Sequence, residues 1–389
     1  MLSTPRVQLG RLARLAAATL LAASALGVAP TGAAAKERPF PPPRDLTFYG
    51  RGWGHGVGMS QYGARGRALV GQTTAQILAH YYAGTTLGQR SPTTVVRVLV
   101  MTGFAATPAK PATVTGRGGM WTIDGVAGTF PADARLTLAP TSAGATTWTL
   151  KVIASTGSVL KTATVSTAVI VRPASSASFL ELTSKASTAN QYRGYLRIRL
   201  TTTVMVINHV GLDLYLRGVV PAEMPSSWPA EALKAQSIAA RSYAVNHLHS
   251  STGTYDVYDD TRSQVYRGRR GEAAATNAAI AATAGTVLLR GTSVANALFH
   301  SSDGGWTENN ENVFVSSTGA IVAGPVSYLR GSSDRARTEP RTTPPRRTRP
   351  GTRRPTPGRP CPRSSRRTRA RTPERCRPST SRGAACPGG

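Results

Sequence analysis

Residues 1–360 of this 389-residue chain contain no cysteine, because Cys361, Cys376 and Cys386 all lie near its C-terminal end. Disulfide bonds and thiol catalysis are therefore excluded for any fold that the preceding residues form. Beyond residue 35 the chain also lacks an apolar run approaching the ~20 residues that a membrane-spanning helix needs.

Acidic residues are scarce as well. The chain has 18 Asp and Glu against 47 Lys and Arg, which gives a formal net charge of +29. Such an excess suits a polyanionic partner, for example an anionic cell wall, a membrane surface or nucleic acid. No nucleic-acid motif accompanies the basic residues, so we expect no nucleic-acid partner.

Residues 331–389 lack Val, Ile, Leu, Met, Phe, Tyr and Trp altogether and contain eleven Pro and seventeen Arg. No hydrophobic core can form from that composition, which predicts a disordered, low-complexity basic tail. The change in composition is abrupt, and Arg, Pro, Ala and Gly have GC-rich codons. One hypothesis is a frameshift near residues 331–338, so that the chain is a damaged product without its native C-terminus. The alternative is a genuine tail that binds the cell wall.

Residues 1–35 have the pattern of a secretory signal peptide. Arg6, Arg11 and Arg14 precede an apolar run over residues 15–28, and the small residues that end at Ala35 suit a cleavage site. We therefore expect a secreted or cell-wall protein cleaved near Ala35. An uncleaved signal anchor, which would hold the protein at a membrane, is the alternative.

The remaining sequence predicts an α+β fold. A proline-rich leader at 36–47 is followed by a glycine-rich segment with a helix at 48–92, an all-β insert at 93–185 and a core at 190–330. In the first half we expect a helix at 74–82, strands at 95–100, 136–138, 148–153 and 163–171, and turns at 118–119 and 156–157.

In the second half Leu196, Ile198 and Leu200 alternate with arginines, which predicts a strand with one buried face. A strand at 204–210 should pair with it. Residues 212–220 then lead to a loop that contains Glu223. We expect a following helix to about residue 246, capped by Ser226 or Ser227. A helix at 273–284 and a hairpin of residues 287–289 and 294–299 come next.

Glu223 is the candidate catalytic residue. Val219, Val220, Met224 and Trp228 can enclose its carboxyl group, and a carboxyl group away from water can stay protonated near neutral pH, as a general acid must. The start of the following helix would favour the ionised form instead. A buried structural glutamate is the alternative.

The glycine-dense run at 52–63 supplies further candidates. Glycine allows a close backbone approach to a ligand, and polar or aromatic side chains here could contact a sugar. The candidate substrate-binding residues of this run are His55, Ser60, Gln61 and Tyr62. The alternative is a tight structural loop around a buried Trp53.

Other candidates lie in the core segment. The remaining candidate substrate-binding residues are Arg241, Tyr243, Gln264, Asp303, Gly304 and Gly305. Arg241 could instead satisfy a buried carboxylate, and Asp303 could stabilise a turn. The one-residue spacing of His247 and His249 puts them on different helix faces, so with His300 they predict no metal site. We expect no cofactor.

Several blocks of this sequence together resemble the SpoIID/LytB family, named for the stage II sporulation protein D of spore-forming bacteria. The matching blocks include Tyr192–Gly194, Val206–Asn208, Tyr215–Pro225, Ala232–Gln236, Ala239–Ala244, Asp260–Thr261, Gln264–Tyr266 and Ser302–Glu308. The run at 52–63 is also a family hallmark, although in sporulation members it follows the main domain. This different order leaves open whether residues 48–87 pack beside Glu223.

The resemblance implies a protein directed at peptidoglycan. Sporulation members are lytic transglycosylases that cut glycan strands without peptide stems, and their catalytic glutamate corresponds to Glu223. A single glutamate suffices there because the muramic acid C6 hydroxyl is the nucleophile, which gives 1,6-anhydro ends. Other members are called amidase enhancers, which implies a cell-wall amidase as a partner instead of catalysis.

Overall fold

The computed structural model describes residues 50–248 and 253–334. The predicted signal peptide, the leader, His249 and the tail from residue 335 onward lie outside the described residues. All contacts reported below lie within the unit that begins at Trp53.

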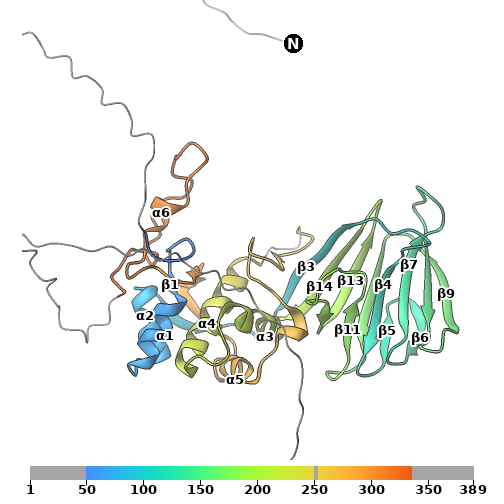
Figure 1. Ribbon diagram of the computed structural model, residues 1–389, viewed down its shortest axis with the longest axis horizontal. Helices are drawn as coiled ribbons and strands as arrows, with labels where there is room; N and C mark the ends of the chain where they lie inside the picture. Colours follow the sequence, from blue (N-terminus) through green and yellow to red (C-terminus); the bar gives the residue numbers. More distant parts are fainter. Residues whose placement is uncertain (1–49, 249–252, 335–389) are drawn as a thin grey trace, which may run out of the picture. The chain divides into compact units, whose positions relative to one another are not determined.

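The described part is α+β, as predicted, with helices and mixed or antiparallel sheets (Figure 1). The α-helices are α1 (Gln61–Leu69), α2 (Thr74–Tyr81), α3 (Leu212–Glu223), α4 (Ala230–Asn246), α5 (Ala274–Ala282) and the short α6 (Asn310–Val313), and Gly268–Gly271 forms a 3₁₀ turn. Among these residues no helix is both long and apolar enough to cross a bilayer.

Two large sheets contain most of the strands. The first has seven strands in the order β15 (Val257–Tyr258), β3 (Val95–Phe104), β14 (Val204–Gly211), β13 (Tyr195–Leu200), β10 (Ala168–Pro173), β5 (Trp121–Ile123) and β6 (Val126–Phe130). The second has six, in the order β12 (Gln191–Tyr192), β11 (Phe179–Leu182), β4 (Ala112–Arg117), β7 (Arg135–Pro140), β8 (Trp148–Ile153) and β9 (Val159–Val165).

A single hydrophobic core includes residues of both large sheets, such as Leu136 and Leu150 of the second and Leu196 and Ile198 of the first. The first sheet combines strands from residues 93–185 with strands from residues 190–330. The all-β insert is therefore continuous in hydrogen bonding with the core segment, and the boundary between them stays a prediction.

Two small sheets join distant segments. β1 (Met59–Ser60) pairs in parallel with β18 (Phe299–His300), and β2 (Thr86–Gln89), β16 (Thr286–Arg290) and β17 (Ser293–Val294) form the other. The glycine-rich segment is thus held against residues 298–308. An isolated β-bridge between Trp53 and Ser302 extends the same contact.

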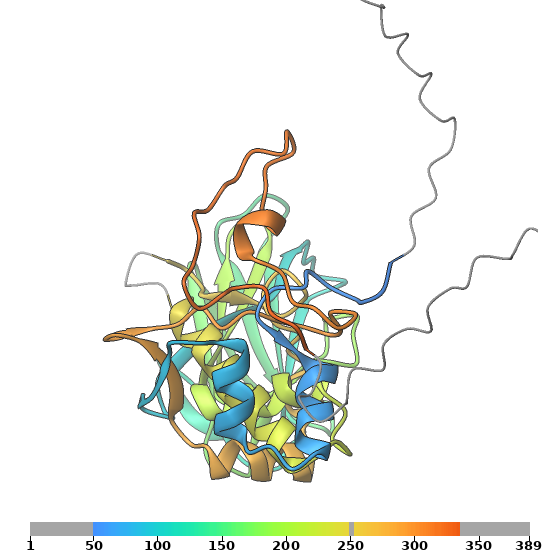
Figure 2. The same ribbon diagram turned by 90° about the vertical axis from the view of Figure 1, so that its left-hand side faces the viewer.

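Helix α4 lies among the other helices and contacts α1, α2, α3 and α5 (Figure 2). Its alanines permit this close packing, because Ala232, Ala235, Ala239 and Ala240 are buried. The first three belong to the core that also holds Ile77 and Leu233 of the helical part, and Ala240 belongs to the core of the two large sheets.

Many local predictions are confirmed. Leu196, Ile198 and Leu200 are buried on β13, β14 pairs with that strand, and α4 ends at Asn246. The turns at 118–119 and 156–157 connect β4 with β5 and β8 with β9.

Other predictions are wrong in detail. The strand expected at 163–171 is two strands, β9 and β10, because the chain turns between Val165 and Ala168. Glu223 is the last residue of α3 and not part of a loop. The N-cap of α4 is Pro229, with no side-chain capping bond from Ser226 or Ser227. The glycine-dense run contains the start of α1, which we did not expect.

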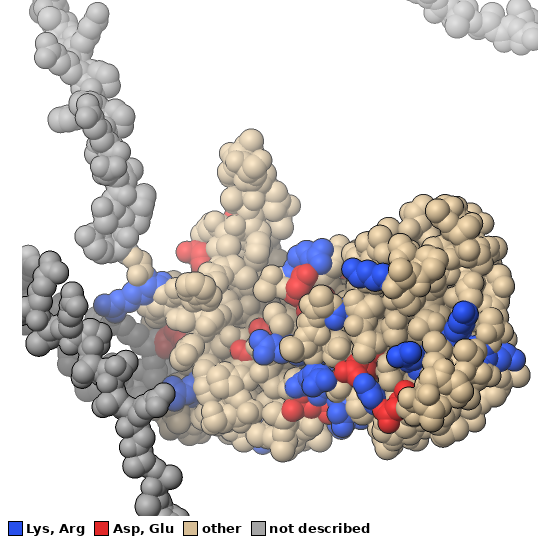
Figure 3. All heavy atoms as spheres, turned by 45° about the vertical axis from the view of Figure 1, so that its right-hand side comes forward, with Lys and Arg blue, Asp and Glu red and all other residues tan. Residues whose placement is uncertain are grey.

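The first four residues of the predicted tail, 331–334, are described by the structure. The Thr307 N–H donates to the Ser332 carbonyl, and the Ser332 N–H donates to the Thr307 hydroxyl. The Asp334 carboxylate accepts bonds from Arg67 and Tyr81. Residues 331–334 therefore pack against the fold, whereas the remainder of the predicted tail lies outside the described residues. On the face that Figure 3 shows, basic and acidic side chains lie beside one another, so the positive charge there forms no single continuous patch.

Candidate active site

Glu223 opens into a pocket of about 350 Å³. The pocket lies where the C-terminal end of α3 meets α4, the loop at 261–265 and the segment at 298–299. Its lining residues are His55, Glu223, Tyr243, Thr261, Arg262, Ser263, Gln264, Val265, Leu298, Phe299 and Phe314.

The Glu223 carboxylate has two defined hydrogen-bond donors. The backbone N–H of Val265 donates to Oε1 over 3.1 Å, and the Gln61 side-chain amide donates to Oε2 over 3.5 Å. Both bonds orient the carboxyl group while it remains partly exposed to the pocket. The group is therefore fixed in direction and still accessible to a ligand.

Burial raises the pKa of Glu223 above its ordinary value, although the bonds from Val265 and Gln61 and the charge of Arg267 oppose this change. The helix contributes in the same direction as burial. Because Glu223 is the last residue of α3, it lies at the partly negative end of that helix, which disfavours a carboxylate. We expected the start of α4 to favour the ionised form of Glu223. The end of α3 opposes that effect and favours the neutral form.

The glycine-rich segment does reach Glu223. Gly58 has a φ of +73°, and a Cβ atom built there would lie 2.0 Å from the carbonyl oxygen of Leu298. Only glycine allows this close approach, which pairs β1 with β18 and directs Gln61, the first residue of α1, to the carboxylate. Of the segment at 48–87, Gln61 therefore lies beside Glu223.

His55 lines the same pocket. Its Nδ1 accepts a hydrogen bond from the backbone N–H of Val57 over 3.1 Å, and its ring contacts the rings of His300 and Phe314. Burial lowers its pKa, with a smaller opposite effect from the carbonyl of Phe299. The lowered pKa favours the neutral imidazole, which adds no positive charge beside Glu223.

Tyr243 and Gln264 also face the pocket. The Tyr243 ring stacks on His247 with centroids 4.0 Å apart. Gln264 is buried, accepts a bond from Tyr215 over 3.3 Å and donates one to the Ala240 carbonyl over 3.4 Å. Gln264 therefore holds the 261–265 loop against α3 and α4, and that loop supplies the Val265 N–H.

Other predicted residues take structural positions. Ser60 is the buried N-cap of α1 and accepts a bond from the Gly63 N–H over 3.1 Å. Arg241 is 0% exposed and donates to Asp213 and to the carbonyls of Thr286 and Ile280. Because it has no exposed surface, Arg241 cannot reach a ligand in this conformation. Its bond to Asp213 agrees with the alternative that Arg241 satisfies a buried carboxylate.

Asp303, Gly304 and Gly305 form a turn in which Asp303 Oδ1 accepts a bond from the Gly305 N–H over 2.9 Å. None of the three lines the Glu223 pocket. Tyr62 is 56% exposed and makes an edge contact with Trp228 at 4.9 Å between centroids. Trp53 is 79% exposed, so the expected alternative of a loop around a buried tryptophan is wrong.

Sequence reasoning missed part of the pocket wall. The expected enclosure came from neighbours of Glu223 in the chain, whereas the pocket is lined by residues of the 261–265 loop, by Leu298 and Phe299, and by Phe314. The block at 260–266 was a signal for the loop. No local pattern indicated Phe314.

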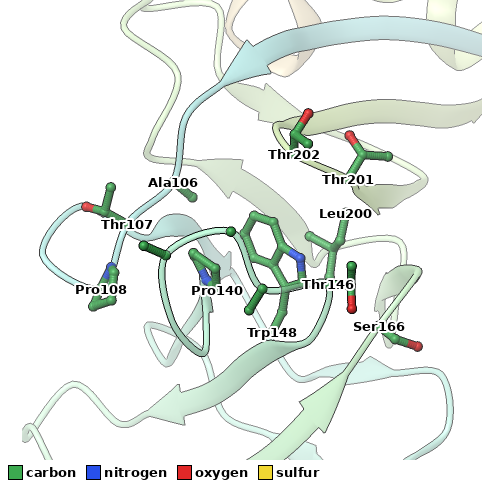
Figure 4. A pocket seen from close by; sticks show the side chains of 13 residues that line it. Ala106, Thr107, Pro108, Pro140, Thr146, Trp148, Ser166, Leu200, Thr201 and Thr202 are labelled. Carbon is green, nitrogen blue, oxygen red and sulfur yellow. The ribbon is translucent and has the colours of Figure 1, made fainter.

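A larger cavity of about 550 Å³ lies at the loop ends of the two large sheets (Figure 4). Its wall consists of Trp148, prolines and small or hydroxyl-bearing residues such as Thr146, Ser166 and Thr201. Because its lining has no titratable group, this cavity offers no acid–base chemistry. Among the cavities described, the Glu223 pocket alone presents a carboxyl group of raised pKa.

The fold and the site define an α+β protein with one carboxyl group positioned in a mixed polar and aromatic pocket. Residues 201–289 match the family model described as SpoIID, stage II sporulation protein. The match covers the segment that contains most of the motifs for which the sequence resembles the SpoIID/LytB family.

Three relatives illustrate the similarity. The chain is 44% identical over 108 residues to the amidase enhancer of Bacillus subtilis, which covers 28% of this chain and 14% of that protein. It is 32% identical over 126 residues to stage II sporulation protein D of the same organism, covering 28% and 37%. An uncharacterised protein of Brachyspira hyodysenteriae is 34% identical over 125 residues, covering 32% and 34%.

The chain thus spans between 14% and 37% of the length of these relatives. No solved structure matches it.

Proposed function

We propose that this chain is a peptidoglycan-directed lytic transglycosylase in which Glu223 is the single general acid and base. The observation that carries the proposal is the placement of Glu223: a carboxyl group of raised pKa, oriented by two donors, at the edge of a pocket. The names of the relatives support a role at the cell wall.

The reaction requires two proton transfers by one group. Neutral Glu223 first protonates the glycosidic oxygen as the bond from C1 to that oxygen breaks. The resulting carboxylate then accepts the proton of the muramic acid C6 hydroxyl, whose oxygen forms the new bond to C1. Protons balance without water, and Glu223 returns to its neutral form. Positioned proton transfer of this kind contributes about 10²–10⁴-fold.

The surrounding groups suit both stages. The pocket raises the pKa of Glu223, which favours the acid form, while the Val265 and Gln61 donors stabilise the carboxylate that follows. Exposed Tyr62 lies in contact with partly buried Trp228, and the two rings could stack on sugar rings beside the site.

The test uses Glu223→Gln with Glu231→Gln as a matched control. Glu231 lies in the first turn of α4, where its carboxylate binds Lys234 and Thr74 and takes no part in the pocket. Stem-free glycan is incubated with each protein, and mass spectrometry measures 1,6-anhydro-muramic ends. We expect Glu223→Gln to lose about 10²–10⁴-fold in rate and Glu231→Gln to keep it. Equal product from Glu223→Gln and the unmodified protein would exclude Glu223 from the chemistry.

A second candidate function is a non-catalytic amidase enhancer, favoured by the 44% identity to a relative of that name. It predicts that the protein cleaves no glycan but increases the rate of a cell-wall amidase. Under this alternative, Glu223→Gln would stimulate the amidase as well as the unmodified protein does.

Either function places the protein at the cell wall, and we propose that it is exported and cleaved near Ala35. N-terminal sequencing of protein recovered from the culture medium or wall tests this. Sequencing the gene across the codons for residues 331–338 tests the frameshift hypothesis, and an intact reading frame through Gly389 would reject it.

A further inference from the structure

A third cavity, of about 450 Å³, lies apart from the Glu223 pocket and shares no lining residue with it. It is formed where the end of β10, the connection to β11, the start of β13 and helix α3 meet. Its lining residues are Arg172, Pro173, Ser175, Ser176, Ser178, Arg193, Gly194, Tyr195, Leu214 and Arg217. Every charged side chain of this wall is an arginine.

Two of the three arginines already form an ion pair with a carboxylate of the protein. Arg172 donates through Nε and Nη2 to Asp124, over 2.8 and 2.9 Å. Arg193 donates in the same way to Glu272, over 2.5 and 3.0 Å, and also to the carbonyl of Ser176. The positive charges of these two side chains are therefore neutralised within the protein.

Arg217 differs from both. Within residues 50–248 and 253–334 it forms no ion pair, and its Nε is buried without a hydrogen-bond partner. A buried donor without an acceptor is unfavourable, and more so on a charged group. Arg217 therefore brings an unneutralised guanidinium to the wall of a cavity whose other charges are balanced.

The surroundings of Arg217 strengthen attraction to an anion. Leu214, one turn earlier on α3, lies in the same wall with Pro173 and Tyr195, and the Arg172 guanidinium stacks over the Tyr195 ring at 4.2 Å. Apolar walls lower the local dielectric and so increase the interaction between opposite charges. A guanidinium binds carboxylate or phosphate oxygens through parallel N–H donors.

We propose that this cavity is a binding site for one oxyanionic group, a carboxylate or a phosphate, held by Arg217. Because Arg172 and Arg193 are paired with carboxylates, the one charge left at Arg217 should bind one such group. Serine hydroxyls at Ser175 and Ser178, which bond to each other over 2.9 Å, complete a polar side of the cavity. The site does not depend on the chemistry at Glu223 and would recognise a charged group on a larger polymer.

The experiment titrates ¹⁵N-labelled full chain with potassium acetate and, separately, with inorganic phosphate, at constant ionic strength set by chloride. The arginine Nε–H resonances report binding. For the unmodified protein we expect a saturable shift of the Arg217 resonance. Tighter binding of acetate identifies a carboxylate as the source, and tighter binding of phosphate identifies a phosphate group.

Arg217→Gln should weaken binding of the preferred anion at least tenfold. Arg217→Lys keeps the charge but loses the parallel N–H donors of the guanidinium. Its affinity for the anion should therefore lie between those of the unmodified protein and Arg217→Gln. The matched control is Arg290→Gln, which removes an exposed arginine of the β16–β17 hairpin and should bind as the unmodified protein does. Unchanged binding by Arg217→Gln, or equal weakening by Arg290→Gln, would overturn the proposal.

Glu223→Gln separates this proposal from the proposed function. We expect that variant to bind the anion normally whether or not it cleaves glycan. Loss of anion binding in Glu223→Gln would contradict a separate site.

Discussion

Asp334 offers the sharpest test of whether residues 331–334 belong to the fold. Its Oδ1 accepts hydrogen bonds from Arg67 Nη2 over 3.0 Å and from the Tyr81 hydroxyl over 2.5 Å. The Asp334 and Arg67 side chains are only 5% and 7% exposed. Arg67 belongs to α1, whose first residue is Gln61. Asp334 therefore anchors the helix that presents Gln61 to Glu223.

The perturbation is Asp334→Asn, which keeps the size of the side chain and removes its charge. Removal of one partner of a buried ion pair costs about 3–5 kcal/mol. Because the asparagine oxygen can still accept one bond, we expect the free energy of unfolding to fall by about 3 kcal/mol, the lower end of that range. Urea unfolding followed by circular dichroism measures it.

The matched control is Asp124→Asn. Asp124 pairs with Arg172 at the surface, where the two side chains are 40% and 41% exposed, so its loss should cost no more than about 1 kcal/mol. A cost for Asp334→Asn that is no larger than for Asp124→Asn would refute the assignment of residues 331–334 to the fold.

The pH dependence gives an independent check. Burial alone would raise the pKa of Asp334, but bonds from His80, Tyr81 and Arg67 outweigh it and hold that pKa below the ordinary value of 3.8. Because the folded pKa is the lower one, the stabilisation is present above the unfolded value and is lost as the pH falls through the folded value. The difference between Asp334→Asn and the unmodified protein should therefore shrink in acid.

Two further predictions concern the Glu223 pocket. Gln61→Leu removes a donor to the Glu223 carboxylate, so the pKa of Glu223 should rise further. The alkaline limb of the pH–rate profile for glycan cleavage should then move to higher pH. A shift of that limb to lower pH would contradict the assigned bond. Gly58→Ala puts a Cβ against the Leu298 carbonyl at a φ of +73° and should lower the free energy of unfolding by about 1–3 kcal/mol more than Gly71→Ala, whose φ of +85° is strained but whose surroundings are open. A similar decrease in the free energy of unfolding for both variants, measured by urea unfolding, would show that the Leu298 carbonyl moves away from the added methyl group.

The sequence alone determined the features that depend on local pattern. Alternation at Leu196, Ile198 and Leu200 predicted β13 because side chains of a strand point to opposite faces at every step. The alanine-rich stretch ending at Asn246 predicted α4, and the glycine-containing dipeptides at 118–119 and 156–157 predicted turns between strands. Glu223 was identified because its neighbours are apolar, and the family motifs surround it.

Only the tertiary structure decided which distant segments meet. Gln61 and Glu223 are 162 positions apart, and Arg67 and Asp334 are 267 apart. Local composition carries no information on such pairs, because strand pairing and helix packing bring them together. The same packing buried Arg241, which local pattern left open between a ligand contact and an internal ion pair. Sequence thus determined which elements form, and long-range packing determined which side chains share a pocket.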